Sequence, residues 1–230
     1  MLTLSKDYPI LVDDEAKSQT LKFWSSDSKE SYSKNFKSGW EYENSEDLVY
    51  EFNEWGYRTK NIDDLDKDFA LVFGCSYTEG VGLYQKDIWC EKLCKELDID
   101  IFNLAKGGSS PCISYMNTTL YVKNLIRYKP KLVICQWPQA FRRTFSHLQE
   151  KSEKVIMADE YDLKMVGYNI NTEASNMDMS WFKDRWLKED GEMYKESFFN
   201  FYSTDILWKA LDVPVYHWTW SGDFTNKNDK

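Results

Sequence analysis

The stretch 69–82, FALVFGCSYTEGVG, constrains the fold of this chain more than any other segment. Its apolar run ends at Gly74, and Ser76 and two further glycines follow before an amphipathic segment begins. A continuous apolar run of this length is typical of a strand that is buried on both faces, and small residues permit a sharp exit from it. The sequence therefore predicts a strand over residues 69–73. Its carboxyl end would present Ser76 at the edge where open α/β sheets bind their ligands.

Strand-like and helix-like segments alternate along the rest of the chain. Helices between strands imply a parallel sheet with right-handed crossovers. We therefore predict a three-layer α/β/α sandwich around a mainly parallel sheet. A short helix is also expected from the spacing of Phe141, Phe145 and Leu148. The remaining expected elements are strands over 100–105, 131–137 and 213–220, and helices over 86–97, 113–128 and 194–211.

The first 65 residues have a different character. Residues 24–47 are rich in Ser, Lys, Asn and Glu and show no clean apolar period, although a short strand is expected before Gly56. This part lacks enough regular apolar pattern to form a core of its own. We expect residues 1–65 to be an N-terminal extension that packs on one main α/β domain, residues 66–230.

Composition excludes several classes of protein. The net charge of -9 argues against nucleic-acid binding, because the phosphate backbone would be repelled. Neither a signal peptide nor an apolar run of about 18 residues is present, so we expect a cytoplasmic protein without a membrane span. Five cysteines without a CxxC pair, and only two histidines, indicate reduced thiols and predict no metal site. We predict no cofactor; an oligomer or a larger assembly stays open.

Three short motifs connect this pattern to a known family. Residues 74–80, GCSYTEG, resemble the G-D-S-x-T-x-G block of the SGNH/GDSL hydrolase superfamily, which carries the nucleophilic serine. The N-x-x-x-x-G pattern that runs from Asn103 to Gly108 is similar to the second block, and residues 53–58 match an N-x-x-G-[FY]-R segment that precedes the first. The resemblance implies a flavodoxin-like sandwich in which Ser76 attacks an ester. The backbone N–H groups of Ser76 and Gly108 would then stabilise the oxyanion.

The third block of the superfamily departs from its usual form. No G-x-N-D follows the strand over 131–137, and Gln139 lies about where the asparagine would be. Its side-chain amide could donate a hydrogen bond to the oxyanion in the same way. We expect Gln136, Trp137 and Arg142 to line the substrate pocket.

The last block, D-x-x-H, which would supply the general base, is not found. Of the two histidines, His147 is expected to be structural, and His217 lies within the last predicted strand. If the chain is a complete enzyme, His217 must be the base, with Asp212 or Asp223 as its orienting partner.

Two functions from different classes therefore remain. One is a serine hydrolase that acts on an ester of a small molecule, a lipid or a carbohydrate through Ser76. The other is a non-catalytic protein of the same fold that serves in binding or assembly. A nucleotide-binding loop is disfavoured because neither G-x-G-x-x-G nor the P-loop Lys-Ser/Thr is present. A nucleophilic Cys75 is disfavoured because neighbouring residues of a strand point to opposite faces.

Overall fold

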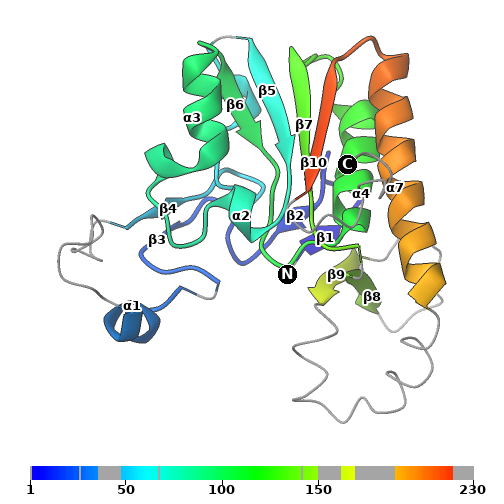
Figure 1. The fold of residues 1–230 in the computed structure, drawn as a ribbon. Coiled ribbons are helices and arrows are strands. Elements are labelled where there is room, and N and C mark those ends of the chain that lie inside the picture. The colour runs from blue at the N-terminus through cyan, green and yellow to red at the C-terminus, as the bar shows by residue number, and fades with distance from the viewer. Residues whose placement is uncertain are drawn as a thin grey trace, which may run out of the picture.

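A four-stranded parallel sheet forms the centre of the protein (Figure 1). The computed structural model describes residues 2–25, 27–35, 48–66, 68–140, 142–149, 162–168 and 190–219. The order of the strands in the sheet is β10-β7-β5-β6, so β5 lies inside the sheet. These strands confirm the four that were predicted: β5 has the predicted bounds, and the other three are slightly shorter than predicted. Their bounds are Phe69–Phe73 for β5, Asp100–Asn103 for β6, Leu132–Trp137 for β7 and Val215–Thr219 for β10.

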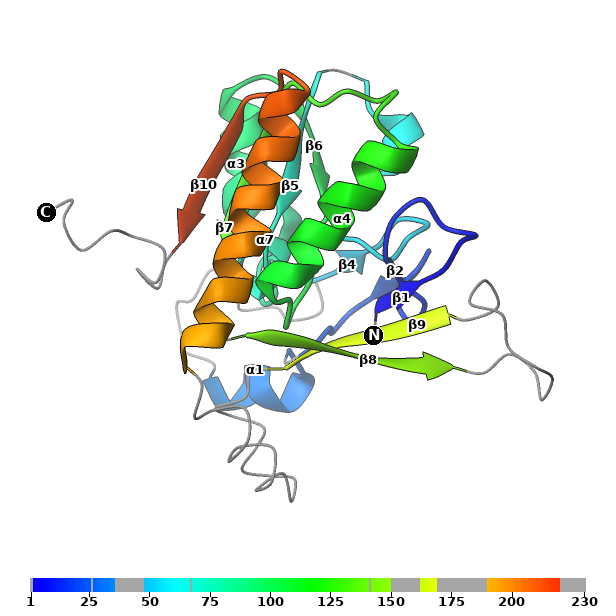
Figure 2. The same cartoon turned by 90° about the vertical axis from the view of Figure 1, so that its right-hand side faces the viewer.

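Helices cover both faces of this sheet, as expected of an α/β protein (Figures 1 and 2). On one face lies α3 (Trp89–Glu96), which follows the short 3-10 helix η3 (Gln85–Asp87). On the other face α4 (Pro111–Asn124) and α7 (Asp190–Ala210) pack against each other. Within the described residues, no helix is both long and apolar enough to span a bilayer.

Alternate residues of β5 build two separate hydrophobic clusters. Ala70 and Val72 pack with Cys90 and Cys94 of α3. The other face of β5 belongs to a larger cluster with residues of β7 and α7, among them Leu71, Phe73, Val133 and Trp208. Burial on both faces is the reason that β5 is apolar at every position. Each large apolar side chain buried in this way contributes about 1.5–3 kcal/mol.

A second, antiparallel sheet joins the beginning of the chain to its middle. Its order is β2-β1-β9-β8, built from β1 (Leu2–Leu4), β2 (Val12–Asp13), β8 (Arg143–Gln149) and β9 (Asp162–Tyr168). The helix expected from Phe141, Phe145 and Leu148 was therefore wrong. Residues 143–149 form seven ladder pairs with β9 instead, and β9 in turn pairs with β1. Partners that are distant in sequence decided the structure here, and they overrode a weak local period.

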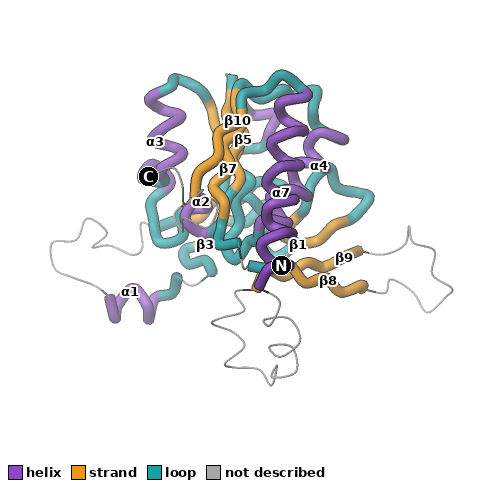
Figure 3. The backbone as a smooth tube through the Cα atoms, turned by 45° about the vertical axis from the view of Figure 1, so that its right-hand side comes forward, coloured by secondary structure: helices purple, strands orange, loops and turns teal. Residues whose placement is uncertain are grey.

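The N-terminal part shares its core with the sheet. Ile10, Leu11 and Tyr57 are fully buried in the same cluster as Phe102 and Trp208. Within this part lie α1 (Lys29–Asn35), labelled in Figure 3, and η2 (Ile62–Asp64). β3 (Thr20–Leu21) pairs with β4 (Tyr50–Glu51), the short strand expected before Gly56 (Figure 1).

The motif at residues 53–58 forms a hydrogen-bonded turn that connects the N-terminal part to the main sheet domain. Asn53 Oδ1 accepts hydrogen bonds from the backbone N–H groups of Trp55 and Tyr57, both at 3.0 Å. The buried guanidinium of Arg58 donates to the carbonyl oxygens of Gly80 and Leu83, at 2.6 and 2.8 Å. Burial lowers the pKa of Arg58. This arginine therefore attaches the N-terminal part to the loop that follows the Ser76 turn.

Candidate functional site

The turn between β5 and α2 (Ser76–Glu79) places Ser76 where the sequence predicted it. The turn is tight: a Cβ atom added at Gly74 would lie 2.5 Å from Thr78 Oγ1, which is why this position needs glycine. Cys75 is fully buried, Ser76 is half-buried and Tyr77 is exposed. Of the two candidate nucleophiles, only the serine is accessible to a substrate.

Gln136 holds this turn from the neighbouring strand. Its Oε1 accepts hydrogen bonds from the backbone N–H of Cys75 and from Thr78 Oγ1, both at 3.1 Å. Its Nε2 donates to the carbonyl oxygen of Trp137 at 2.8 Å. Gln136 is buried, with both ends of its amide engaged within the protein. Gln136 therefore fixes the Ser76 turn to β7 through hydrogen bonds. The sequence had predicted that it lines a substrate pocket.

The glycine loop after β6 lies against Ser76. Asn103 is the last residue of β6 before this loop, and its Nδ2 donates a hydrogen bond to the carbonyl oxygen of Thr78 at 2.8 Å. A Cβ atom added at Gly107 would stand 3.8 Å from Ser76 Cβ, and the next residue, Gly108, has a φ of +76°. That left-handed conformation favours glycine. The structure thus brings together two of the segments that the motifs had linked.

Two backbone N–H groups at this junction have no acceptor among the residues that the structure describes. Ser76 is the first residue of α2, and its N–H has no partner in the helix. Among the hydrogen bonds of the described residues, neither the N–H of Ser76 nor that of Gly108 is used. The Gly107 N–H, in contrast, donates to Glu79 Oε2 at 2.6 Å.

A buried cluster of charges lies beside the turn, and sequence reasoning missed it. Lys106 Nζ is 2.8 Å from Asp13 Oδ2 and 3.4 Å from Glu79 Oε1, and all three side chains are at most 7% exposed. Trp24 Nε1 donates to Glu79 Oε1 at 2.9 Å, and the Lys106 ammonium lies over the Trp24 ring. The only local signal was Glu79, three residues after Ser76 and so on the same side of a helix.

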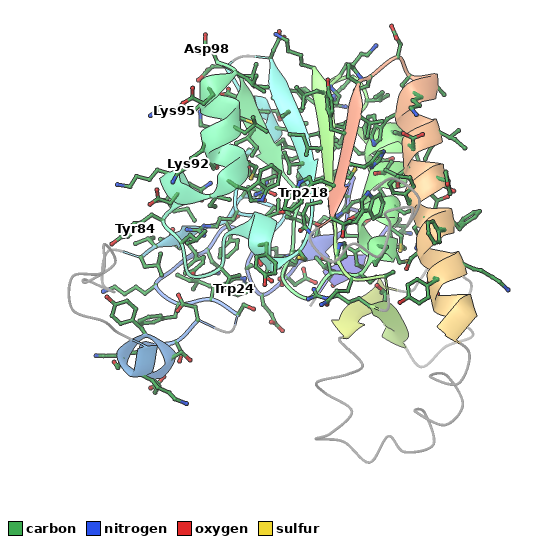
Figure 4. All side chains as sticks on the ribbon, viewed as in Figure 1. Trp24, Tyr84, Lys92, Lys95, Asp98 and Trp218 are labelled. Atoms are coloured by element: carbon green, nitrogen blue, oxygen red, sulfur yellow. The ribbon has the colours of Figure 1, made fainter. Side chains whose placement is uncertain are left out.

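Aromatic side chains flank α2 on both sides (Figure 4). On one side is Trp24, which bonds to Glu79. On the other is Trp89, whose Nε1 donates to Thr78 Oγ1 at 3.2 Å and whose ring meets that of Trp218 edge to face. Ser76 therefore lies on a short helix between the Trp24 indole and the pair formed by Trp89 and Trp218.

The loop after β7 holds Gln139 and Arg142, both half-buried. Arg142 Nε donates to Gln139 Oε1 at 3.1 Å, and the Arg142 N–H donates to the Gln139 carbonyl oxygen at 3.0 Å. These contacts form a local turn. Among the hydrogen bonds of the described residues, none joins either side chain to Ser76.

The His217 side chain forms its hydrogen bonds on the face of the sheet that α7 covers. Its Nδ1 accepts a hydrogen bond from Trp137 Nε1 at 3.0 Å, and its Nε2 is 3.1 Å from Asp205 Oδ1 on α7. Because Trp137 can only donate, the neutral ring carries its proton on Nε2 and donates to Asp205. Burial lowers the pKa of His217, although Asp205 opposes this shift. Both nitrogens are thus committed away from Ser76, and Trp137 is buried in the core rather than in a pocket.

The partner of His217 also differs from the two expected. Asp205 takes that place, with Lys209 Nζ 2.8 Å from its other oxygen. Asp212 lies in the turn between α7 and β10, with a φ of 52°. Asp223 and the His147 side chain lie outside the described residues.

Comparisons with known proteins do not identify a function, so the function is inferred from the geometry described above. A scan of protein-family models and a search of curated protein sequences each found no match to the chain. Among the residues with described side chains, no group of three or more His, Cys, Asp or Glu is arranged to hold a metal ion.

Proposed function

We propose that this chain is a serine hydrolase of the SGNH/GDSL type that acts on an ester of a small molecule, a lipid or a carbohydrate. The observation that carries the proposal is the proximity of the Ser76 turn to the loop at residues 107–108, where two backbone N–H groups have no acceptor within the described residues. Such donors, fixed before the reaction, are what a developing oxyanion requires. With it we propose an SGNH-type sandwich over residues 66–230, an extension over 1–65 and a cytoplasmic location.

In this mechanism Ser76 Oγ attacks the ester carbonyl carbon, and the Ser76 and Gly108 N–H groups donate to the oxygen that becomes negative. The alcohol then leaves, and water hydrolyses the acyl-serine. Gln139 can add a third donor, since its Nε2 has no acceptor among the described residues. Arg142 lies beside it as a contact for the substrate.

The proton of Ser76 passes to solvent in this proposal, because both His217 nitrogens are engaged elsewhere. Glu79 is close to Ser76, but three donors already occupy its oxygens, so it orients the loop rather than accepting the proton. Turnover is therefore expected to be slow. Its rate should rise with pH without a plateau near the ordinary histidine pKa of about 6.5.

A burst experiment with p-nitrophenyl acetate tests this function. The wild-type chain should release p-nitrophenol in a rapid phase of about one equivalent per chain, followed by a slower steady rate. Ser76→Ala should abolish the burst, whereas Ser203→Ala, a matched change on α7, should leave it intact. His217→Ala should not change the amplitude.

A second candidate is a non-catalytic protein of the same fold that serves in binding or assembly. Two observations favour it: His217 is not directed at Ser76, and α7 exposes Phe199, Tyr202 and Ile206 at 57–63%. Large exposed apolar side chains on one helix are typical of interfaces. A wild-type chain that shows neither a burst nor labelling by a fluorophosphonate would support this candidate over the hydrolase.

A further inference from the structure

A pocket of about 380 Å³ lies between α3 and the segment that precedes β5, away from the Ser76 turn. Its lining comes from β4, residues 59–65, η3, α3 and the start of β6, and includes no residue of the Ser76 turn or of the 106–108 loop. The volume is in the range of small-molecule sites.

The wall of this pocket is fixed to the edge of the sheet. Thr59 Oγ1 donates to the carbonyl oxygen of Ile101 at 3.1 Å and accepts from the Asn103 N–H at 3.3 Å. These bonds hold residues 59–65 along β6 in the place of a further strand. The cavity is therefore preformed, which reduces the entropy that a ligand would lose on binding.

The pocket combines an apolar floor with a charged rim. Cys94, Ile99 and Ile101 are buried at its base. Burial raises the pKa of the Cys94 thiol to about 12, so this sulfur stays protonated and acts as an apolar contact. A ligand that fits must carry a short hydrocarbon part as well as a polar end.

Carboxylates outnumber ammonium groups on the rim. The lining includes Glu51, Glu91 and Asp100, against Lys60 and Lys95. Lys60 Nζ is already 4.0 Å from Asp66 Oδ2, outside the pocket lining. The whole chain carries a net charge of -9, which adds to the attraction for cations.

Glu91 is the group at which a cation would be best placed. It is half-buried on α3, and its Oε1 accepts a hydrogen bond from Gln85. Among the described residues, its Oε2 has no hydrogen-bond partner. A partly buried carboxylate with one free oxygen gains most from a new charge-assisted donor.

We propose that this pocket binds a small aliphatic amine, whose ammonium group pairs with Glu91 while its carbon chain lies on Ile99 and Ile101. Glu51 stands at the exposed rim, where it is placed for a second ammonium group. An aliphatic diamine such as cadaverine, which has five carbons between two ammonium groups, is therefore the probe for this site. The site is independent of Ser76 chemistry.

Binding should depend on pH through Glu91. Burial raises its pKa; Asp100 adds to the shift, whereas the Gln85 hydrogen bond, Arg58 and Lys60 oppose it. A cation binds the ionised carboxylate, so affinity should increase as pH rises through this raised pKa. Binding near that pH should release a proton, since the ligand lowers the pKa again.

Calorimetric titration of the full chain with cadaverine tests the site. Saturable 1:1 binding is expected, with proton release measured by repeating the titration in buffers of different ionisation enthalpy. Glu91→Gln, which keeps the shape of the side chain, should weaken binding by about 10-fold or more. Glu96→Gln, the same change on the exposed end of α3, should alter it by less than about 2-fold.

Two neutral or anionic probes of equal length complete the test: 1,5-pentanediol and glutarate should not compete with cadaverine. Thermal unfolding checks that each variant is folded, and Glu51→Gln should weaken binding by a smaller factor than Glu91→Gln. The proposal is overturned if the wild type shows no saturable binding. It is overturned equally if both glutamate variants on α3 weaken binding alike, or if glutarate binds better than cadaverine.

Discussion

At the scale of single residues, His217 shows how a candidate base becomes a structural group. The ring lies between Trp137 and Asp205, and the Phe201 ring is 4.5 Å from it between centroids. A neutral imidazole satisfies both partners, one through each nitrogen. A protonated ring could no longer accept from Trp137, so the proton would break one hydrogen bond of this group.

Acid should therefore destabilise the protein through this residue. Burial lowers the pKa of His217 in the folded state, so below about 6.5 the unfolded chain binds the proton more readily. Stability is then lost as pH falls through the unfolded pKa towards the folded one. Urea unfolding at pH 7.5 and at pH 5.5 measures this. The unfolding free energy should decrease more between these pH values for the wild type than for His217→Gln. Equal losses would contradict this account.

Local chemistry explains which residues of the site could be foreseen. Ser76 and the glycine loop were predicted because strand exits and glycines are encoded in a few consecutive residues. The pairing of Lys106 with Asp13 and Glu79 was not, since it joins three segments that only the folded chain brings together. The partners of His217 were missed for the same reason.

At the scale of elements, Glu79 connects α2 to the loop after β6. Replacing it with Gln removes the charge beside Lys106 and leaves one acceptor oxygen for three donors, which come from Trp24, Lys106 and Gly107. We expect a loss of about 1–3 kcal/mol in unfolding free energy, because Lys106 keeps Asp13 as a partner. Urea denaturation measures this.

Glu96→Gln is the control for that measurement, since Glu96 is exposed on α3 and should change the unfolding free energy by less than about 0.5 kcal/mol. Faster amide hydrogen exchange at Gly107 in Glu79→Gln would show that the loop has loosened. If amide exchange and the unfolding free energy were both unchanged, Glu79 would not be what connects α2 to the loop after β6.

Secondary-structure elements also differ in how well their own residues predict them. The parallel strands are continuous apolar runs, and each was predicted from its own residues. Strand β8 exists because β9 pairs with it along seven residues, and β9 in turn pairs with β1. Such a ladder joins the middle of the chain to its beginning, so a local period could not reveal it.

At the scale of the whole molecule, the N-terminal part should unfold together with the sheet. Leu11 is fully buried in the large core cluster, and its N–H donates to Asn117 Oδ1 on α4 at 3.0 Å. Leu11→Ala should cost about 2–5 kcal/mol. Tryptophan fluorescence and far-ultraviolet circular dichroism should still report one coincident transition in urea.

Leu97→Ala provides the matched change, because Leu97 is 49% exposed at the end of α3 and should cost well under about 1 kcal/mol. An early, separate transition of the N-terminal part in Leu11→Ala would show that residues 1–65 form an independent unit.

The bonds of Thr59 along β6 have a consequence for how copies of this protein meet. A bare strand edge is a template on which another chain can polymerise, strand upon strand. Here one hydroxyl occupies both the Ile101 carbonyl and the Asn103 N–H. On that side, growth of the sheet ends at β6. The same threonine that shapes the wall of the pocket thus occupies two of the edge groups with which a strand of another copy would pair.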